Sequence, residues 1–185
     1  MSVFCDVFQK CVDNKCVRIS DKFPVPTGTL IINGDDIDLT DPPHYVLSYT
    51  NPSIMFDKWG VIDGESYDPN SGYAKGIVSP RNALFNAGGS PASISCPGGG
   101  FDVLSLYMTP FNSNLLVTLV GTYRGNQVGE TVNLQLGSPA GPTIFESQLS
   151  AFRNIDKLTF TYNINLYEYF VMDDLTININ SPCNI

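Results

Sequence analysis

The stretch LLVTLVGTY at residues 115–123 is followed by RGNQ at 124–127 and by TVNLQL at 131–136. In both flanking segments apolar and polar residues alternate, which is the two-residue period of a strand with one buried face. The segment between them contains Gly and Asn, which tolerate the positive φ that tight hairpin turns require. This part of the chain therefore predicts a β-hairpin.

The rest of the chain consists of short apolar runs separated by turn-forming residues. The chain contains 14 Asp against 4 Glu, with 16 Asn, 16 Gly and 13 Pro, so it is poor in the residues that build exposed helix surface. Strands are predicted at 29–33, 54–62, 76–79, 83–86, 92–96, 101–109, 115–124, 128–136, 143–149, 157–163 and 169–178, and a helical turn only within 147–154. Strands at roughly 8–15-residue spacing predict an all-β protein, an antiparallel β-sandwich rather than a parallel α/β sheet.

The first part of the chain differs from the rest. Three of the five cysteines, Cys5, Cys11 and Cys16, precede a linker-like segment at 23–28. We predict a cysteine-rich arm at 1–27 and a sandwich domain at 28–185, with one or two arm cysteines tethered by disulfides to Cys96 or Cys183. Because five is an odd number, one thiol stays free or pairs between chains. Because the spacings lack a C-x2-C knuckle, a zinc site is disfavoured.

The cysteine content also indicates a compartment. Disulfide frameworks persist in oxidising surroundings, so a secreted, extracellular protein is expected. The first six residues lack a basic and apolar leader, and we therefore expect a mature chain from which the leader has been removed.

Net charge and hydropathy exclude two classes of partner. The formal net charge is −8 and the pI about 4.4, without a Lys/Arg cluster, which argues against nucleic acid. No apolar run approaches the roughly 18 residues of a spanning helix, which argues against membrane insertion.

Catalytic motifs are weak. The single histidine, His44, stands beside two prolines, and no G-x-S-x-G elbow is present. The carboxylates do not exclude a glycosidase pair, but no motif nominates one. We expect a non-catalytic protein and keep a glycan-active enzyme as the third hypothesis.

Clustered acids predict a cation site. Four carboxylates fall within residues 35–41, and Asp173-Asp174 interrupts an apolar strand. Dense carboxylates repel one another unless a cation relieves them, and Ca²⁺ prefers Asp, Asn and backbone oxygens. The alternative is a bulge or a sheet edge with solvated carboxylates.

Aromatic residues with neighbouring polar groups suggest a sugar site. Flat rings and amides are the equipment that recognises sugar rings. The turn-rich segment 66–73 can present Tyr67 and Tyr73 together. The predicted ligand-binding residues are Trp59, Tyr67, Tyr73, Tyr123, Arg124 and Asn126. For Trp59 the alternative is burial in a core strand, and exposed tyrosines also suit adhesion or edge pairing.

Four segments, 59–62, 71–86, 101–107 and 170–175, give the chain a resemblance to a jelly-roll β-sandwich domain of secreted fungal and bacterial proteins. The likeness covers about residues 28–178, and the closing F-x-x-D-D-L segment is similar to that of calcium-containing carbohydrate-binding modules. The resemblance implies a structural Ca²⁺ held by Asp173 or Asp174 together with Asp35 or Asp36.

These observations lead to one functional hypothesis and an alternative. The leading hypothesis is a secreted, non-catalytic module that recognises a cell-wall or surface glycan. The alternative is a secreted effector or surface-structural protein that contacts a protein partner.

Overall fold

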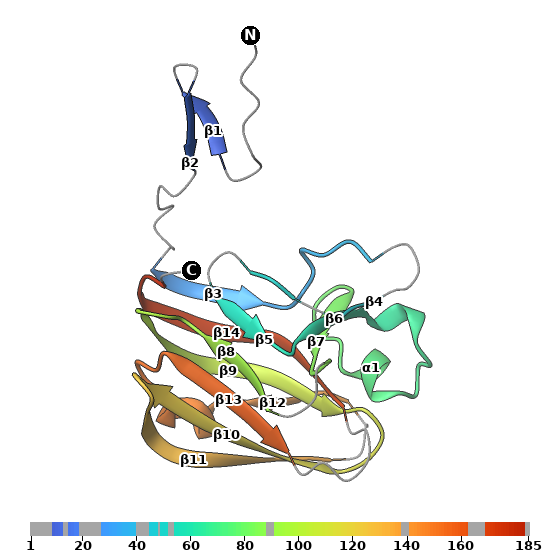
Figure 1. The fold of residues 1–185 in the computed structure, drawn as a ribbon. Coiled ribbons are helices and arrows are strands. Elements are labelled where there is room, and N and C mark those ends of the chain that lie inside the picture. The colour runs from blue at the N-terminus through green and yellow to red at the C-terminus, as the bar shows by residue number, and fades with distance from the viewer. Residues whose placement is uncertain are drawn as a thin grey trace.

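The computed structural model describes residues 9–12, 15–18, 27–39, 45–47, 49–51, 54–87, 91–137, 141–162 and 169–183 (Figure 1). Over these ranges the chain forms a five-stranded sheet, a seven-stranded sheet and a separate two-stranded hairpin, all antiparallel. The two larger sheets pack as a jelly-roll type sandwich, so the predicted fold class is confirmed.

Each sheet mixes strands from distant parts of the chain. The five-stranded sheet has the order β11 (Asn126–Leu136), β10 (Leu115–Tyr123), β13 (Lys157–Tyr162), β8 (Ala92–Ser95) and β5 (Met55–Asp57). The seven-stranded sheet has the order β12 (Thr143–Phe145), β9 (Gly100–Pro110), β14 (Phe170–Ser181), β7 (Asn82–Phe85), β6 (Gly60–Asp63) and β4 (Tyr45–Val46), and β3 (Gly28–Ile32) also pairs with β14. The short helices are η1 (Gly64–Ser66), α1 (Gly72–Lys75) and η2 (Ser147–Ala151). None of the helices in the described ranges is long and apolar enough to cross a membrane.

The predicted hairpin is confirmed as β10 and β11. Its turn residues Arg124 and Gly125 have φ of 51° and 79°, the paired positive values of a type I′ turn. That turn matches the right-handed twist of the flanking strands. In β10 the side chains of Leu115, Val117 and Leu119 are buried at alternate positions, as the sequence period predicts.

The main core lies between the two sheets. Trp59 is 1% exposed there, and its ring meets the edges of Phe160 and Phe170 at centroid distances of 5.1 and 5.7 Å. The prediction of Trp59 as a sugar-binding platform is therefore wrong, because a ring enclosed on both sides cannot stack on a ligand. The predicted strand 54–62 is likewise divided into β5 and β6, where Lys58 has a φ of 64°.

A bulge in β14 explains the two consecutive acids of the last strand. Met172 and Leu175 both face the main core although they are three positions apart. A regular strand would place them on opposite faces, and the extra residue Asp174, with a φ of 44°, restores the alternation. Asp173 consequently lies on the outer face, two residues after Val171.

The disulfide differs from the predicted tether. Cys96 follows β8 and is bonded to Cys183, which follows β14, closing a separation of 87 residues. Neither cysteine is therefore left to hold the arm. The strands β1 (Gln9–Val12) and β2 (Lys15–Arg18) form their own hairpin, with Cys11 opposite Cys16, and Cys5 lies outside the described residues. The domain boundary at residue 27 stays a prediction.

Candidate functional site

A second apolar cluster lies on the outer face of the seven-stranded sheet, beneath η1 and α1. Its buried members are Ile62, Tyr73, Ala83, Phe85 and Val171, with Tyr67, Ile77, Ala87, Phe111 and Tyr169 packed around them. Gly72 permits the close approach of α1, because a Cβ at this position would overlap the carbonyl oxygen of Pro110. The turn-rich segment predicted at 66–73 thus includes a short helix that covers the sheet.

Asp63 and Ser71 begin the two covering turns. The Ser71 hydroxyl accepts a hydrogen bond from the Ala74 N–H at 3.3 Å and caps α1. Asp63 is fully buried at the start of η1 and accepts hydrogen bonds from the Glu65 N–H at 3.1 Å, the Ser66 hydroxyl at 2.9 Å and the Arg81 guanidinium at 2.7 Å. Burial alone would raise the pKa of Asp63, but these hydrogen bonds, led by that from Arg81, hold it below its usual value.

Asp173 anchors the segment that joins α1 to β7. Its buried carboxylate accepts hydrogen bonds from the backbone N–H groups of Val78 at 2.6 Å and Ser79 at 2.8 Å, and from the Ser79 hydroxyl at 3.0 Å. The Asp174 N–H donates a further bond at 2.8 Å. Burial raises the pKa of Asp173, and the hydrogen bonds oppose that rise. The strand predicted at 76–79 is instead a loop held by this carboxylate.

The Asp173 surroundings do not fit a calcium ligand. Its oxygens face N–H and O–H donors, which place positive hydrogen where a cation would sit. Hydrogen bonds from the loop backbone thus stabilise the Asp173 carboxylate.

The other predicted ligands also have hydrogen-bond partners. Asp35 accepts from the Asn82 N–H at 2.9 Å, Asp36 from the Tyr49 hydroxyl at 3.2 Å, and Asp174 from the Asn33 amide at 3.5 Å. Within the described part of the chain, no group of three or more Asp, Glu, His or Cys side chains converges on one point. Calcium binding by Asp35, Asp36 or Asp174 stays a prediction.

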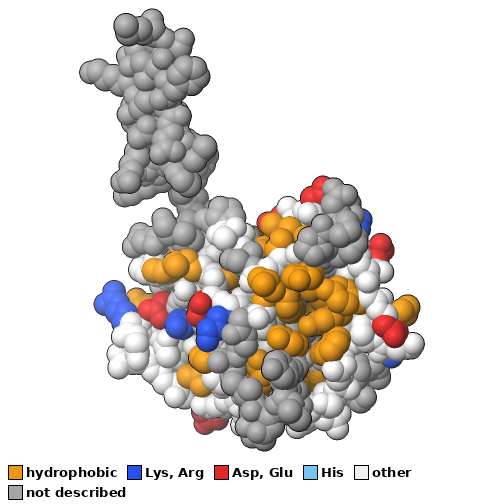
Figure 2. Space-filling model, turned by 45° about the vertical axis from the view of Figure 1, so that its right-hand side comes forward, with side chains coloured by type: hydrophobic (Ala, Val, Ile, Leu, Met, Phe, Trp, Pro, Cys, Tyr) orange, Lys and Arg blue, Asp and Glu red, His pale blue; other side chains and the backbone are white. Residues whose placement is uncertain are grey.

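An aromatic pocket opens beside the second cluster. It encloses about 240 Å³ and is lined by Tyr45, Leu47, Tyr67, Tyr73, Phe85, Ala87 and Tyr169. Figure 2 looks toward the side of the molecule where α1 and β6 lie and shows hydrophobic side chains gathered on this face. Tyr45 and Leu47 are 41% and 65% exposed at its rim, whereas Tyr73 and Phe85 form its buried floor.

The rings in this pocket support one another. Tyr67 meets Tyr73 edge-on at 4.9 Å between centroids, and Phe85 meets Tyr73 at 5.9 Å and Tyr169 at 6.4 Å. Edge-to-face pairs of this kind fix ring orientation. Burial raises the pKa of Tyr67, so its hydroxyl is protonated at neutral pH and able to donate a hydrogen bond.

The structure brings together two of the six predicted ligand-binding residues. Tyr67 and Tyr73 share the aromatic pocket, as their common turn-rich segment indicated. Tyr123, Arg124 and Asn126 lie instead at the β10–β11 turn of the other sheet. There the Arg124 guanidinium stands 5.2 Å from the Tyr123 ring centre, and the Asn126 amide donates to the Arg124 carbonyl at 3.4 Å.

The sequence analysis missed the remaining lining residues. Tyr45, Phe85 and Tyr169 come from three strands or strand ends that are far apart in the chain. Phe85 and Tyr169 carried a partial signal, because they lie in the predicted strands 83–86 and 169–178, but nothing in the local pattern says that they line one pocket.

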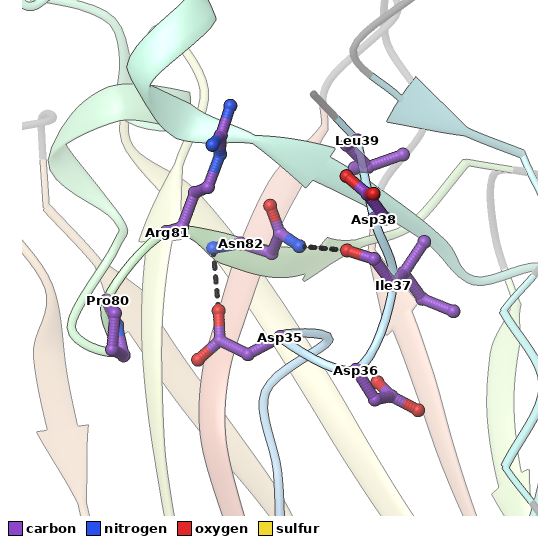
Figure 3. Close-up of a pocket in the computed structure, with 8 residues that line it drawn as sticks. All are labelled: Asp35, Asp36, Ile37, Asp38, Leu39, Pro80, Arg81 and Asn82. Atoms are coloured by element: carbon purple, nitrogen blue, oxygen red, sulfur yellow. Dashed lines mark hydrogen bonds between the residues drawn. The ribbon is translucent and has the colours of Figure 1, made fainter. Parts of the chain in front are cut away.

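One further pocket adjoins the aromatic pocket, and another adjoins that one. The middle pocket, of about 550 Å³, shares Tyr67 with the aromatic pocket. It is lined by Gly64, Glu65, Tyr67, Pro69, Ala74, Ile77, Ser79 and Pro80. A third, of about 360 Å³, is lined by Asp35, Asp36, Ile37, Asp38, Leu39, Pro80, Arg81 and Asn82 (Figure 3), and it shares Pro80 with the second. The three pockets therefore follow one another along the surface.

Comparison with known proteins returned no matching family model and no matching curated protein. Among solved structures, a DUF4465 family protein from Bacteroides caccae has a TM-score of 0.49 at 12% identity, over 86% of this chain and 90% of its own. The module TmCBM61, solved in complex with β-1,4-galactotriose, has a TM-score of 0.38 at 10% identity, over 80% of this chain and 94% of its own. The family 11 carbohydrate-binding module from Clostridium thermocellum, in complex with a β-1,3-1,4-mixed-linked tetrasaccharide, has a TM-score of 0.36 at 11% identity, over 83% and 96%. At these values the likenesses identify no ligand for this chain.

Proposed function

We propose that this protein is a secreted, non-catalytic glycan-binding domain and that its site is the aromatic pocket. The observation that carries the proposal is the joint presentation of tyrosine rings over the outer face of the seven-stranded sheet. The C–H face of a sugar packs on aromatic rings, while tyrosine hydroxyls bind sugar hydroxyls.

The pocket has the balance of groups that a sugar needs. Its floor of Tyr73 and Phe85 is apolar and fixed by packing, and its rim carries the phenolic groups of Tyr45 and Tyr67. Because the floor is already ordered, a ligand does not have to immobilise it on binding. None of the described lining residues bears a carboxylate or an imidazole, the groups that acid–base catalysis uses most.

The Cys96–Cys183 disulfide supports the extracellular part of the proposal. Such bonds persist in oxidising compartments and are rare in the cytosol.

Binding of soluble polysaccharides by affinity electrophoresis, followed by calorimetry on the best ligand, tests the proposal. The panel includes β-1,4-galactan and β-1,3-1,4-glucan, since oligosaccharides of these types are bound by the similar modules. We expect Tyr45→Ala to weaken binding about tenfold, the loss of roughly 1.4 kcal/mol. Tyr123→Ala is the matched control on the other sheet and leaves affinity unchanged. Absence of binding to every glycan, or equal affinities for wild type and Tyr45→Ala, would overturn the proposal.

A protein partner is the second candidate. The exposure of Leu47, which has no group to offer sugar hydroxyls, favours it. Co-purification from secreted extracts distinguishes the two, because a stoichiometric protein complex that Leu47→Asp abolishes, with no affinity for glycans, supports the second candidate alone.

Calcium remains a separate prediction with its own test. An ion bound by the folded state raises the unfolding temperature. An unchanged melting temperature in EDTA and in millimolar Ca²⁺ would remove Asp35, Asp36 and Asp174 as ligands.

A further inference from the structure

The third pocket is acidic. Asp35, Asp36 and Asp38 are exposed around it, where the chain leaving β3 faces the start of β7 (Figure 3). Arg81 also lines it, but its guanidinium is paired at 2.7 Å with the buried carboxylate of Asp63. Arg81 also interacts electrostatically with Asp38. Its single positive charge thus faces several carboxylates, and the pocket keeps a negative potential.

A buried acceptor in the pocket wall has no partner. Asn82 is 2% exposed, and its amide group donates to the carbonyls of Gly34 at 3.1 Å and Ile37 at 2.7 Å, which fixes the orientation of the side chain. The remaining oxygen, Asn82 Oδ1, is buried without a hydrogen bond. In Figure 3 it points away from the Ile37 carbonyl, toward the part of the pocket where Arg81 and Asp38 lie. A buried acceptor without a hydrogen bond lowers the stability of the folded state, so a donor from a ligand would be favourable here.

The adjacent residue, Arg81, has an unpaired donor. Arg81 Nε is a buried donor without an acceptor. A hydroxyl group both donates and accepts, so ligand hydroxyls have the chemistry that an unpaired acceptor and an unpaired donor in one pocket wall require. The wall thus suits a ligand with hydroxyls, and the carboxylates suit one with a positive charge.

The size of the pocket favours a molecular cation over a metal ion. The carboxylates surround about 360 Å³, within the range of small-molecule sites, and they do not converge as a group of three. Ca²⁺ requires six to eight oxygens at 2.3–2.6 Å. An ammonium group requires fewer acceptors and tolerates carboxylates at several distances.

We propose that this pocket binds an amino sugar and that the preferred ligand is a glycan with free amino groups. The inference rests on the proposed glycan-binding function. The middle pocket joins the acidic pocket through Pro80 to the aromatic pocket through Tyr67, so one oligosaccharide chain can contact both ends. Sugar rings pack on the tyrosines, and an amino group with its neighbouring hydroxyl meets Asp36, Asp38 and the Asn82 oxygen.

Calorimetry with three hexasaccharides tests this assignment: chitosan hexamer with free amines, its fully N-acetylated form and neutral cellohexaose. We expect the chitosan hexamer to bind about tenfold more tightly than the other two, with the preference falling as salt rises. The double variant Asp36→Asn/Asp38→Asn is expected to abolish the preference, so that the three chains bind with equal affinity. Asp57→Asn, which removes an exposed carboxylate from β5, is the matched control for net charge and retains the preference.

The outcomes separate the two proposals. Equal binding of all three chains overturns the amino-sugar assignment and leaves the glycan-binding function standing. A preference that Asp57→Asn reduces as much as the double variant does is a bulk-charge effect and also overturns the assignment. Binding of none of these chains or of any polysaccharide in the panel overturns the proposed function itself. Calcium bound at Asp36 and Asp38, seen as a stability increase that the double variant abolishes, together with no amine preference, assigns the pocket to a metal.

Discussion

The outer faces of the two sheets differ in what covers them. The outer face of the seven-stranded sheet is covered by η1, α1 and the loop after it, and it carries a second apolar cluster with buried Asp63 and Asp173. The outer face of the five-stranded sheet carries mostly small side chains, with Leu116 exposed among them. In the register of its central strands, Thr118 stands opposite Thr161, and Val120 opposite Thr159.

The difference shows where this fold acquires concave sites. In the paired stretch of β10 and β13 the outward side chains are Thr118, Val120, Thr159 and Thr161, and none of these carries an aromatic ring. The covering turns lift Tyr67 above the sheet beside Tyr73, and the loop anchored by Asp173 shapes the middle pocket through Ser79 and Pro80. The buried carboxylates that hold the cover are thus a condition for the pockets.

The largest effect is expected at the anchor of the cover. Asp173→Ala removes the buried acceptor that binds the Val78 and Ser79 N–H groups and the Ser79 hydroxyl, so we expect a loss of about 3–5 kcal/mol of unfolding free energy. Denaturant titration measures it. Asp57→Ala, an exposed carboxylate on the five-stranded sheet, is expected to cost less than about 0.5 kcal/mol. Equal losses would contradict the anchoring role.

Tyrosines on the two sheets sharpen the comparison. Tyr73 is buried among Tyr67, Phe85 and Phe111, and we expect Tyr73→Ala to cost about 3 kcal/mol. Tyr123 is half-buried beside Arg124 at the β10–β11 turn. We expect Tyr123→Ala to lower the free energy of unfolding by less than about 1 kcal/mol. A larger loss at Tyr123 than at Tyr73 would show that the second cluster contributes little packing energy.

The pH dependence tests the other buried carboxylate of the cover. Since the folded state lowers the pKa of Asp63 below 3.8, its contribution to stability is complete above that pH and is lost as pH falls through the lowered pKa. The stability gap between wild type and Asp63→Asn, followed by denaturation from pH 7 to pH 2, is therefore expected to be widest near neutrality and to shrink below pH 3.8. A gap for Asp63→Asn that widens in acid would reverse the assigned sign.

Much of the sandwich was predictable because its signals are local. The alternation in 115–123 and 131–136 reflects which side chains enter the core, and that pattern is imposed by the immediate neighbours on the strand. Tyr67 and Tyr73 were also found from one short segment. The local signal failed at residues 76–79, whose apolar run reads as a strand but whose N–H groups are taken by Asp173, almost a hundred residues later.

The missed parts of the site share this long-range origin. Tyr45, Phe85 and Tyr169 line one pocket because β4, β7 and β14 belong to one sheet. The sequence of a single strand does not reveal the order of the strands in the sheet. The two consecutive acids at 173–174 indicated an irregular strand. The sequence did not show whether a cation or backbone N–H groups would stabilise them, because the N–H donors come from a loop that only the fold places beside Asp173. Cys96 and Cys183 likewise pair with each other because β8 and β14 end at neighbouring positions, which spacing along the chain does not reveal.

The smallest effect on stability and affinity is expected from a substitution on the outer face of the five-stranded sheet. This substitution tests whether the difference between the two faces extends to glycan binding. Thr159 lies on β13 between Val120 and Ser93 and is half-buried. Thr159→Arg places a long charged side chain across this face, and because no packed ring or buried anchor is disturbed we expect a stability change within about 0.5 kcal/mol and unchanged glycan affinity. Thr159→Ser, which keeps the hydroxyl, is the control, and both are measured by denaturation and by calorimetry beside Tyr45→Ala. Loss of glycan binding in Thr159→Arg, with Tyr45→Ala unaffected, would move the binding site to the five-stranded sheet and leave the covered face as structural reinforcement.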